Sequence, residues 1–229
     1  MKWRIVIVTC CMVLVLLIGV ILLVLARPWW WMYASEDERV TDYLHSDTRP
    51  PALMIVAHPD DELLFGGGML LDTRYNWHVV VVTGSSSAAR YMLDRFSDHR
   101  FREFQDSSRT LGFEGRMWDY EDSPIIYRKY TPECWEALKA SVAKLVRERS
   151  WVRIVTHNKE GEYGHFQHSM VHHLVTSVLG YGHFEVFDLD TAVVCSDKKR
   201  ELCRTLYPSQ QAAFRRHAEW VQHGNSRRM

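Results

Sequence analysis

Residues 57–62 of the chain read AHPDDE and place one imidazole and three carboxylates within five positions: His58, Asp60, Asp61 and Glu62. Carboxylates this close repel one another unless shared protons or a cation hold them, so a divalent metal is the economical explanation. The alternative is the acidic first turn of a helix, which the helix dipole stabilises. That alternative accounts for the acids but not for the histidine, and we therefore predict a metal site here.

A second group of candidate ligands lies in residues 156–168, which read THNKEGEYGHFQH. His165 and His168 are three positions apart, so a helix that begins near Gly164 would carry both on one face, with His172 one turn beyond. A lone histidine on such a helix is more often a surface or core residue than a ligand. Two histidines with one carboxylate, however, form a zinc set that leaves a coordination position for water, which is the catalytic arrangement.

Hydrophobic patterning predicts the scaffold that must position these residues. Apolar runs typical of strands occupy residues 53–57, 78–83, 117–118 and 152–156, and helical spacing occupies residues 98–111, 133–149 and 166–179. Strands that alternate with helices indicate parallel pairing through right-handed crossovers. The expected fold class is therefore α/β, a Rossmann-like, mostly parallel sheet with helices on both faces.

Polar residues follow each predicted strand. These are His58, Asp60 and Asp61 after the first, Gly84 to Ser87 after the second, Asp119 and Asp122 after the third, and His157 and Asn158 after the fourth. Parallel strands bring their carboxyl ends to one edge of a sheet, where ligands of open α/β folds bind. Acids and imidazoles gathered at that edge are not needed for the domain to fold, so we predict a reaction centre there.

The amino-terminal part predicts a membrane anchor. The uncharged run Ile5–Ala26 has 22 residues and would span roughly 33 Å as a helix, enough to cross a bilayer, and the aromatic residues 29–33 resemble an interfacial belt. We expect one transmembrane helix with its belt in residues 1–33, a linker or short helix in 34–51 and a catalytic domain in 52–229. The flanking charges weakly favour a catalytic domain outside the cytoplasm or in a lumen. The tail from Arg215 is expected to be a solvated helix with a frayed end.

Composition excludes several classes of protein. The 28 basic and 28 acidic residues balance, so no polyanion-binding tail is implied and nucleic acid is not an expected partner. The five cysteines include no CxxC pair, which argues against a zinc ribbon or a disulfide framework, and buried thiols are expected in the domain. Residues 66–68 are glycines, but the spaced GxGxxG of a dinucleotide site is absent.

The two motifs together carry a resemblance. AHPDDE at 57–62 and GHxxH at 164–168 resemble the PIG-L/LmbE family of metal-dependent N-acetylglucosaminyl deacetylases. The similarity covers roughly residues 52–214, including Arg100 and Glu103 before Leu111, and the YPSQ segment at 207–210. Either motif alone is moderately specific, whereas both in this order are strong evidence.

The resemblance implies roles for individual residues. His58, Asp61 and His168 match the metal ligands of the family, for zinc or another divalent transition metal, and Asp60 matches its general base. His165 matches the imidazole that stabilises the tetrahedral intermediate or protonates the departing amine. Arg100 and Asp122 match positions that hold the substrate, and Asn158 is also predicted to bind the substrate. A surface ion pair with Glu103 is the alternative for Arg100.

The implied reaction is hydrolysis of an N-acetyl group to acetate and a free amine. The implied partner is a glycolipid or N-acetyl sugar, with N-acetylglucosaminyl-phosphatidylinositol of GPI-anchor biosynthesis as the leading substrate and the endoplasmic reticulum membrane as the expected location. The family members of that pathway present their catalytic domain to the cytoplasm, so the side of the membrane stays open. No oligomeric state is indicated.

Three other functions are alternatives to deacetylation of the lipid-linked substrate. A deacetylase of another N-acetyl sugar would use the same residues. A non-catalytic, membrane-tethered glycan-binding relative would have lost one of His58, Asp60, Asp61 or His168, and all four are present. A metallophosphoesterase would use similar ligands but needs a second metal and more carboxylates.

Overall fold

The computed structural model describes residues 12–19, 34–42, 48–86, 95–122 and 130–228 of the chain. Its centre is a seven-stranded sheet in the order β1-β4-β3-β2-β5-β6-β7. The strands are β1 (Ala34–Val40), β2 (Pro51–Val56), β3 (Asn76–Ser86), β4 (Glu114–Asp122), β5 (Arg153–Thr156), β6 (Glu185–Leu189) and β7 (Gly224–Arg228). Strands β2 to β6 pair in parallel, whereas β1 and β7 are antiparallel edge strands. The predicted mostly parallel α/β sheet is confirmed.

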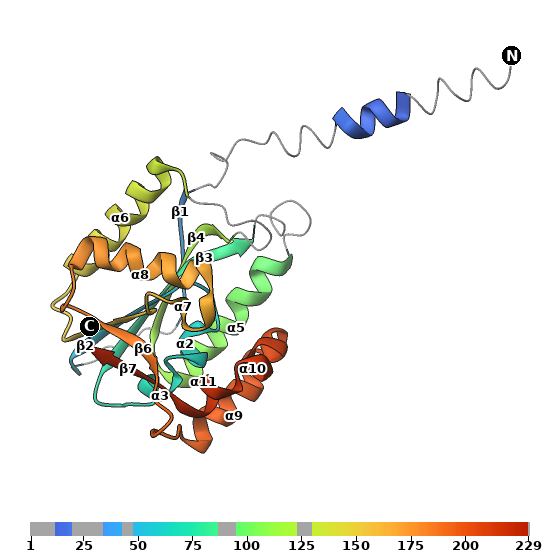
Figure 1. Cartoon of the computed structure of the whole chain (residues 1–229). Helices are drawn as coiled ribbons and strands as arrows, with labels where there is room; N and C mark the ends of the chain where they lie inside the picture. Colours follow the sequence, from blue (N-terminus) through green and yellow to red (C-terminus); the bar gives the residue numbers. More distant parts are fainter. Residues whose placement is uncertain (1–11, 20–33, 43–47, 87–94, 123–129, 229) are drawn as a thin grey trace, which may run out of the picture.

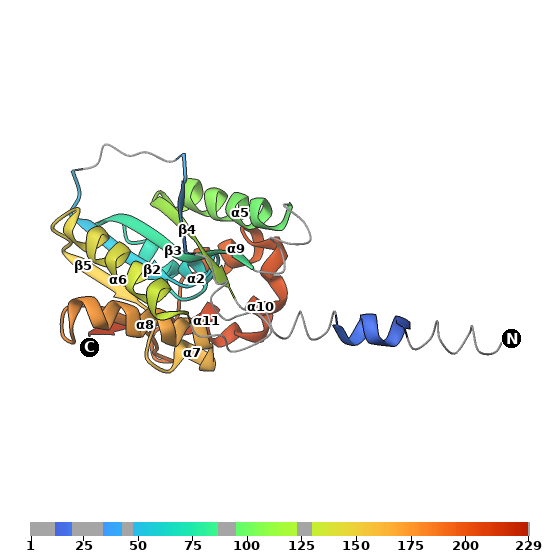
Figure 2. The same cartoon turned by 90° about the horizontal axis from the view of Figure 1, so that it is seen from above.

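Helices cover both faces of the sheet (Figures 1 and 2). They are α2 (Asp61–Leu64), α3 (Gly67–Leu70), α5 (Arg95–Leu111), α6 (Pro132–Arg147), α7 (Gly161–Gly164), α8 (Phe166–Leu179), α9 (Asp197–Thr205), η2 (Pro208–Gln210), α10 (Gln211–Arg216) and α11 (Ala218–His223). Helices α6 and α8 pack on one face, and α2, α3, α5 and α9 to α11 pack on the other.

Local sequence explains the central elements. Strand β2 is buried on both faces because all its residues after Pro51 are apolar. Helix α6 begins where Thr131 accepts a bond from the Cys134 backbone N–H at 3.2 Å, and Pro132 occupies its first turn. Helix α8 has the predicted bounds and ends at Gly180, which adopts a φ of 75°. The apolar run, the helix cap and the glycine are all local features of the sequence. The elements that they define position the ends of the strands.

Two predictions about the flanking segments are wrong. The segment 34–51, expected to be a linker or short helix, contains strand β1, which pairs antiparallel with β4. The tail from Arg215 is helical in α10 and α11, as expected, but its end does not fray and forms strand β7, which pairs antiparallel with β6. Both are polar edge strands, and their formation depends on partners that lie far away in the sequence. The expectation of buried thiols is confirmed, because Cys134, Cys195 and Cys203 are free and buried.

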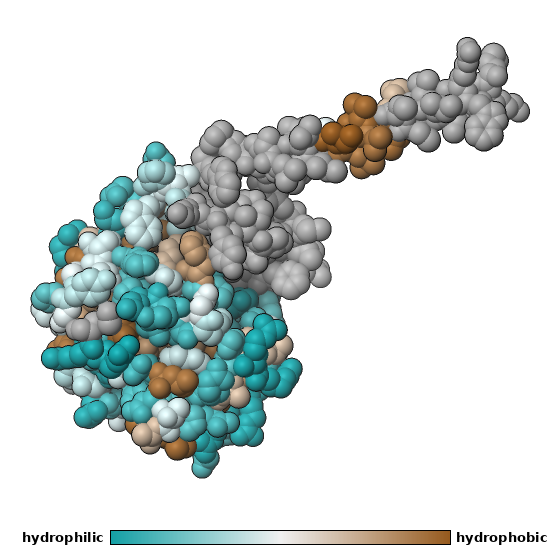
Figure 3. Space-filling model, viewed as in Figure 1, coloured by the Kyte–Doolittle hydropathy of each residue, from teal (hydrophilic) through white to brown (hydrophobic). Residues whose placement is uncertain are grey.

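Residues 12–19, within the predicted membrane anchor, are helical and expose their apolar side chains (Figure 3). The rest of the predicted span, including its aromatic belt, lies outside the described residues. Within the described part of the chain, none of the helices combines the length and hydrophobicity needed to span a membrane.

An ion pair anchors β7 to the parallel sheet. Arg153 Nη2 donates to Glu185 Oε2 at 2.7 Å and to Ser226 Oγ at 2.8 Å, and Ser226 Oγ donates to Glu185 Oε2 at 2.8 Å. Burial raises the pKa of Glu185, but these bonds outweigh it and leave the pKa below its usual value. The three residues therefore link strands β5, β6 and β7.

We expect Glu185→Gln to lower the free energy of unfolding by roughly 1–2 kcal/mol at pH 7. A carboxylate with a lowered folded-state pKa stabilises the protein above its unfolded pKa, and this stability is lost as the pH falls through the folded pKa. The difference between wild type and variant should therefore shrink as the pH falls below about 4.5. Denaturant titrations between pH 3 and 7 measure it. Glu136→Gln, at an exposed pair with Lys139, is the control, and an equal effect there would contradict the prediction.

Candidate metal centre and active site

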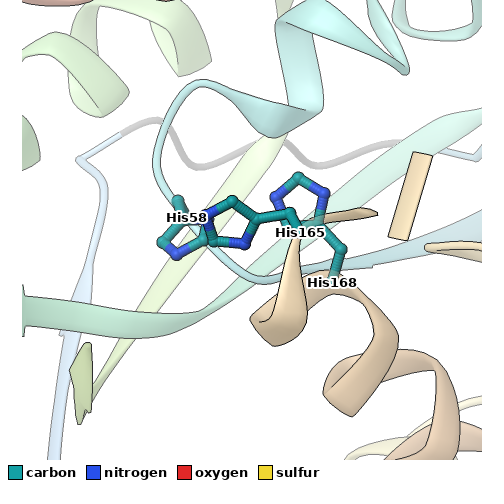
Figure 4. A group of neighbouring side chains, drawn as sticks. All are labelled: His58, His165 and His168. Carbon is teal, nitrogen blue, oxygen red and sulfur yellow. The ribbon is translucent and has the colours of Figure 1, made fainter. Parts of the chain in front are cut away.

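The two motifs meet where the strand order reverses. Strand β2 lies between β3 and β5, and ligands of open α/β folds bind at such a switch point. His58 follows β2, and His165 and His168 lie at the start of α8. Figure 4 shows these three imidazoles close together, one from the segment after β2 and two from the start of α8. The His165 ring centroid lies 4.8 Å from that of His58 and 4.4 Å from that of His168.

The carboxylate of Asp61 lies between two imidazoles. Its Oδ2 is 3.3 Å from His58 Nδ1, and its Oδ1 is 3.3 Å from His168 Nε2. Each separation, taken alone, matches the edge of a tetrahedron with metal–ligand bonds of about 2.0–2.1 Å, and the two run to different oxygens of the carboxylate. Burial raises the pKa of Asp61, but His168, His157 and His58 outweigh it and hold the pKa well below its usual value. Asp61 is therefore an ionised ligand candidate.

The tautomer of His168 tests whether these residues fit a cation. Its Nδ1 donates to Glu162 Oε2 at 2.6 Å, which places the lone pair of the neutral ring on Nε2. That Nε2 is buried, makes no hydrogen bond and faces Asp61 Oδ1. Likewise, His58 Nε2 donates to Gln167 Oε1 at 3.2 Å, which leaves the Nδ1 lone pair towards Asp61. A ring nitrogen that faces a carboxylate is stable there when a proton or a metal ion lies between the two, and this buried set of nitrogen and oxygen donors fits a divalent metal.

His157 lies beside this set. Its ring stacks on that of His168 with centroids 4.0 Å apart. Among the described residues, His58, His165 and His168 form one group of possible metal ligands, and Asp61, His157 and His168 form another. However, the Ala57 backbone N–H donates to His157 Nε2 at 2.9 Å, which occupies that lone pair. Burial lowers the pKa of His157, whereas the Glu162 and Asp61 carboxylates raise it, to about 9. A cation beside Asp61 would offset the charge of that carboxylate and so lower the pKa of His157. The neutral His157 ring, which the bond from the Ala57 N–H requires, would then be favoured.

Asp60 lies at the same point but has different partners. Arg100 Nη2 donates to Asp60 Oδ1 at 3.1 Å and also to the Pro59 carbonyl. Burial raises the pKa of Asp60, the Arg100 charge lowers it and the Asp61 charge raises it, with a result of about 7. A carboxylate with this pKa is suited to accept a proton near neutral pH.

The residues predicted to hold the substrate are placed differently from one another. Arg100 reaches the site, whereas Glu103, its alternative partner, is buried and accepts from the Ser209 backbone N–H at 2.9 Å. Asp122 is the last residue of β4, and its side chain lies outside the described atoms. Asn158 Oδ1 accepts from the Glu162 N–H at 2.9 Å, and its Nδ2 donates to the Phe187 carbonyl at 3.2 Å. The substrate roles of these residues stay predictions.

Glu62, the third acid of the first motif, faces away from the imidazoles. Its Oε1 accepts from Tyr207 Oη at 2.6 Å and Ser107 Oγ at 2.8 Å, and its Oε2 accepts from the Asp60 N–H at 3.0 Å. Burial raises the pKa of Glu62 above its usual value, and these three bonds offset only part of that rise. Asp60 has a φ of 119°, so Glu62 helps to hold a strained backbone position.

Sequence reasoning missed three contacts in the site. Glu162 accepts from two histidines, Gln167 orients His58, and Tyr163 stacks on His217 with ring centroids 3.7 Å apart. The signal for Glu162 was a glutamate between two glycines inside the second motif. No local pattern could have paired Tyr163 with His217, because they lie on different elements.

The sequence model of the PIG-L family, described as GlcNAc-PI de-N-acetylase, matches residues 53–179, more than half of the chain and both motifs. The chain belongs to the PIG-L family. A curated, uncharacterized protein of Acanthamoeba polyphaga mimivirus is 34% identical to this PIG-L-family chain over 134 residues, which is 55% of the chain. The chain covers 56% of the length of that relative.

Two solved structures share the fold of this PIG-L-family chain. The N,N'-diacetylchitobiose deacetylase of Pyrococcus horikoshii matches with a TM-score of 0.55 and 14% sequence identity. The match covers 80% of this chain and 84% of the deacetylase chain. The 4-carboxy-2-hydroxymuconate hydratase GalB of Pseudomonas putida has a TM-score of 0.54 at 18% identity, with coverages of 75% and 82%. At these identities the likeness concerns the fold alone.

Tyr207→Phe tests the support of Asp60 by Glu62. The variant removes one charge-assisted hydrogen bond from a buried carboxylate, and we expect a loss of about 1.5–3 kcal/mol in the free energy of unfolding. Bound metal should be unchanged because Glu62 faces away from the ligands. Chemical denaturation and metal analysis measure both. Tyr181→Phe, at an exposed tyrosine, should leave stability unchanged, and a Tyr207 variant as stable as wild type would contradict the assigned contact.

Proposed function

We propose that this chain is a metal-dependent deacetylase that hydrolyses the N-acetyl group of an N-acetylglucosaminyl substrate. The convergence of His58, Asp61 and His168 around a point that fits a divalent metal carries the proposal. Members of the PIG-L family are hydrolases that act on N-acetyl sugars, which supports the substrate class. We propose N-acetylglucosaminyl-phosphatidylinositol, and hence a step of GPI-anchor biosynthesis, as the leading substrate.

The residues divide the work of the reaction. His58, Asp61 and His168 would hold the cation, which we propose to be zinc. When bound, such a cation polarises an amide carbonyl and makes water acidic near neutral pH. Asp60 takes a proton from the attacking water, and Arg100 holds its carboxylate in place. His165 donates to the oxygen that becomes negative or to the departing nitrogen, which must gain a proton before the amine leaves.

We further propose that residues 5–26 anchor the protein in the membrane of the endoplasmic reticulum as a single span. The uncharged length of this run and the tryptophans that follow it support the anchor. A membrane anchor would bring the site close to a glycolipid. Deacetylation of a free or differently linked N-acetyl sugar is the second candidate, and the same site would perform it.

Acetate release by the full-length protein tests the reaction. We expect release from N-acetylglucosaminyl-phosphatidylinositol that a chelator abolishes and zinc restores, because the polarising charge is lost and regained. Release only from free N-acetyl sugars would favour the second candidate. Phosphate release without acetate release would contradict the deacetylase and indicate a phosphoesterase.

Two variants separate metal binding from proton transfer. We expect Asp60→Asn to retain the metal and lower kcat by about 10²–10⁴-fold, because an amide does not accept the proton. We expect His58→Ala to lose both the metal and the activity. Metal analysis and steady-state kinetics measure the two properties. Retained activity in either variant would contradict the assigned roles.

A further inference from the structure

Glu162 combines three features that are costly together. Its side chain is fully buried, it is ionisable, and its backbone has φ 60° and ψ −65°. Apart from Asp60, it is the one non-glycine residue of the described chain with a positive φ. Such a conformation costs about 1–3 kcal/mol and persists only where surrounding contacts hold it. A residue kept under these conditions needs strong compensating bonds.

Each polar group that faces the Glu162 carboxylate is a donor. Oε1 accepts from the Asn158 backbone N–H at 2.8 Å, and Oε2 accepts from His157 Nδ1 at 2.8 Å and from His168 Nδ1 at 2.6 Å. Asn158 Oδ1 accepts in return from the Glu162 N–H at 2.9 Å. Of the two side chains with this shape, glutamate accepts hydrogen bonds on both terminal atoms, whereas glutamine accepts on only one. Glutamine would point an amide N–H at another donor whichever way it turned.

These bonds decide where two imidazole lone pairs point. With Nδ1–H donating to Glu162, the neutral form of each ring carries its lone pair on Nε2. That of His168 faces Asp61 Oδ1 at 3.3 Å, and that of His157 accepts from the Ala57 N–H at 2.9 Å. Ala57 precedes the ligand candidate His58, so one carboxylate orients a ligand on α8 and also ties the loop after β5 to the end of β2.

We propose that Glu162 is a positioning residue of the metal centre, which sets the Nε2-ligating form of His168 directly and the spacing between the two motifs through His157 and Ala57. The inference rests on the proposed metal site. The inference also explains the backbone strain, because the strained conformation of Glu162 places its carboxylate between the rings of His157 and His168.

Metal affinity of the full-length chain tests this without any assay of activity. The metal-free protein is titrated with Zn²⁺ against a chromophoric chelator and with Co²⁺ in the visible range. We expect Glu162→Gln to weaken Zn²⁺ binding by about 10–100-fold and to change the Co²⁺ absorption bands, because the ligand ring is no longer oriented. The matched control is Glu160→Gln, an exposed acid of the same loop paired with Lys159, and it should behave as wild type.

A second variant keeps the test decisive if Glu162→Gln does not fold, as judged by circular dichroism. His157→Phe keeps an aromatic ring against His168 but removes the bonds to Glu162 and Ala57. We expect an affinity between those of wild type and Glu162→Gln, because the direct bond from His168 to Glu162 remains.

The outcomes separate the inference from the proposed function. The positioning role would be overturned if Glu162→Gln bound Zn²⁺ with wild-type affinity and left the Co²⁺ spectrum unchanged. If only His157→Phe folds, the same two results in that variant would overturn it. In both cases the metal site itself would remain. An equal loss in Glu160→Gln would also overturn it. A wild-type protein that binds neither ion would overturn the proposed function itself.

Discussion

The buried charge of Asp61 is the constraint on which the site depends. This carboxylate is 3% exposed, so folding removes almost all of its water, and the protein must replace that hydration. The His58 backbone N–H donates to it at 2.7 Å, and imidazoles from two loops complete its surroundings at 3.3 Å. Those loops come together because β2 and β5 are neighbours in the sheet. The pairing of two strands distant in sequence therefore decides whether the charge can be buried.

Neighbouring acids in this site have different contacts, which suit them to the different tasks proposed for them. Asp61 faces imidazoles, Asp60 faces a guanidinium, and Glu62 faces hydroxyl groups in the core. The pKa of Asp61 is lowered and that of Asp60 is raised, although the two are adjacent in the chain. A metal ligand must stay ionised, whereas a proton acceptor works best when its pKa lies near the working pH. The positive φ of Asp60 sends the two side chains in different directions.

The fold alone does not determine the chemistry. A deacetylase and a hydratase both share this architecture, with TM-scores of 0.55 and 0.54. The family match and the side chains at the ends of β2 and β5 carry the functional argument instead. The sheet provides a rigid edge with buried strands, and the loops after those strands provide the groups that react.

Local sequence was enough to predict strands β2, β3 and β5, the bounds of α8 and the two motifs that meet at the site, because apolar periodicity and turn residues are local signals. It predicted only two residues of β4 and none of β6. Tertiary structure decided the rest. The edge strands β1 and β7 are polar, and their hydrogen bonds come from partners distant in sequence, so no local pattern reveals them. The carboxylate of Glu162 is an ordinary loop acid in the sequence. It acquires its two histidine partners because the chain folds the loop after β5 against the end of β2, where these imidazoles and the Asn158 backbone N–H replace the water that burial removes from its charge.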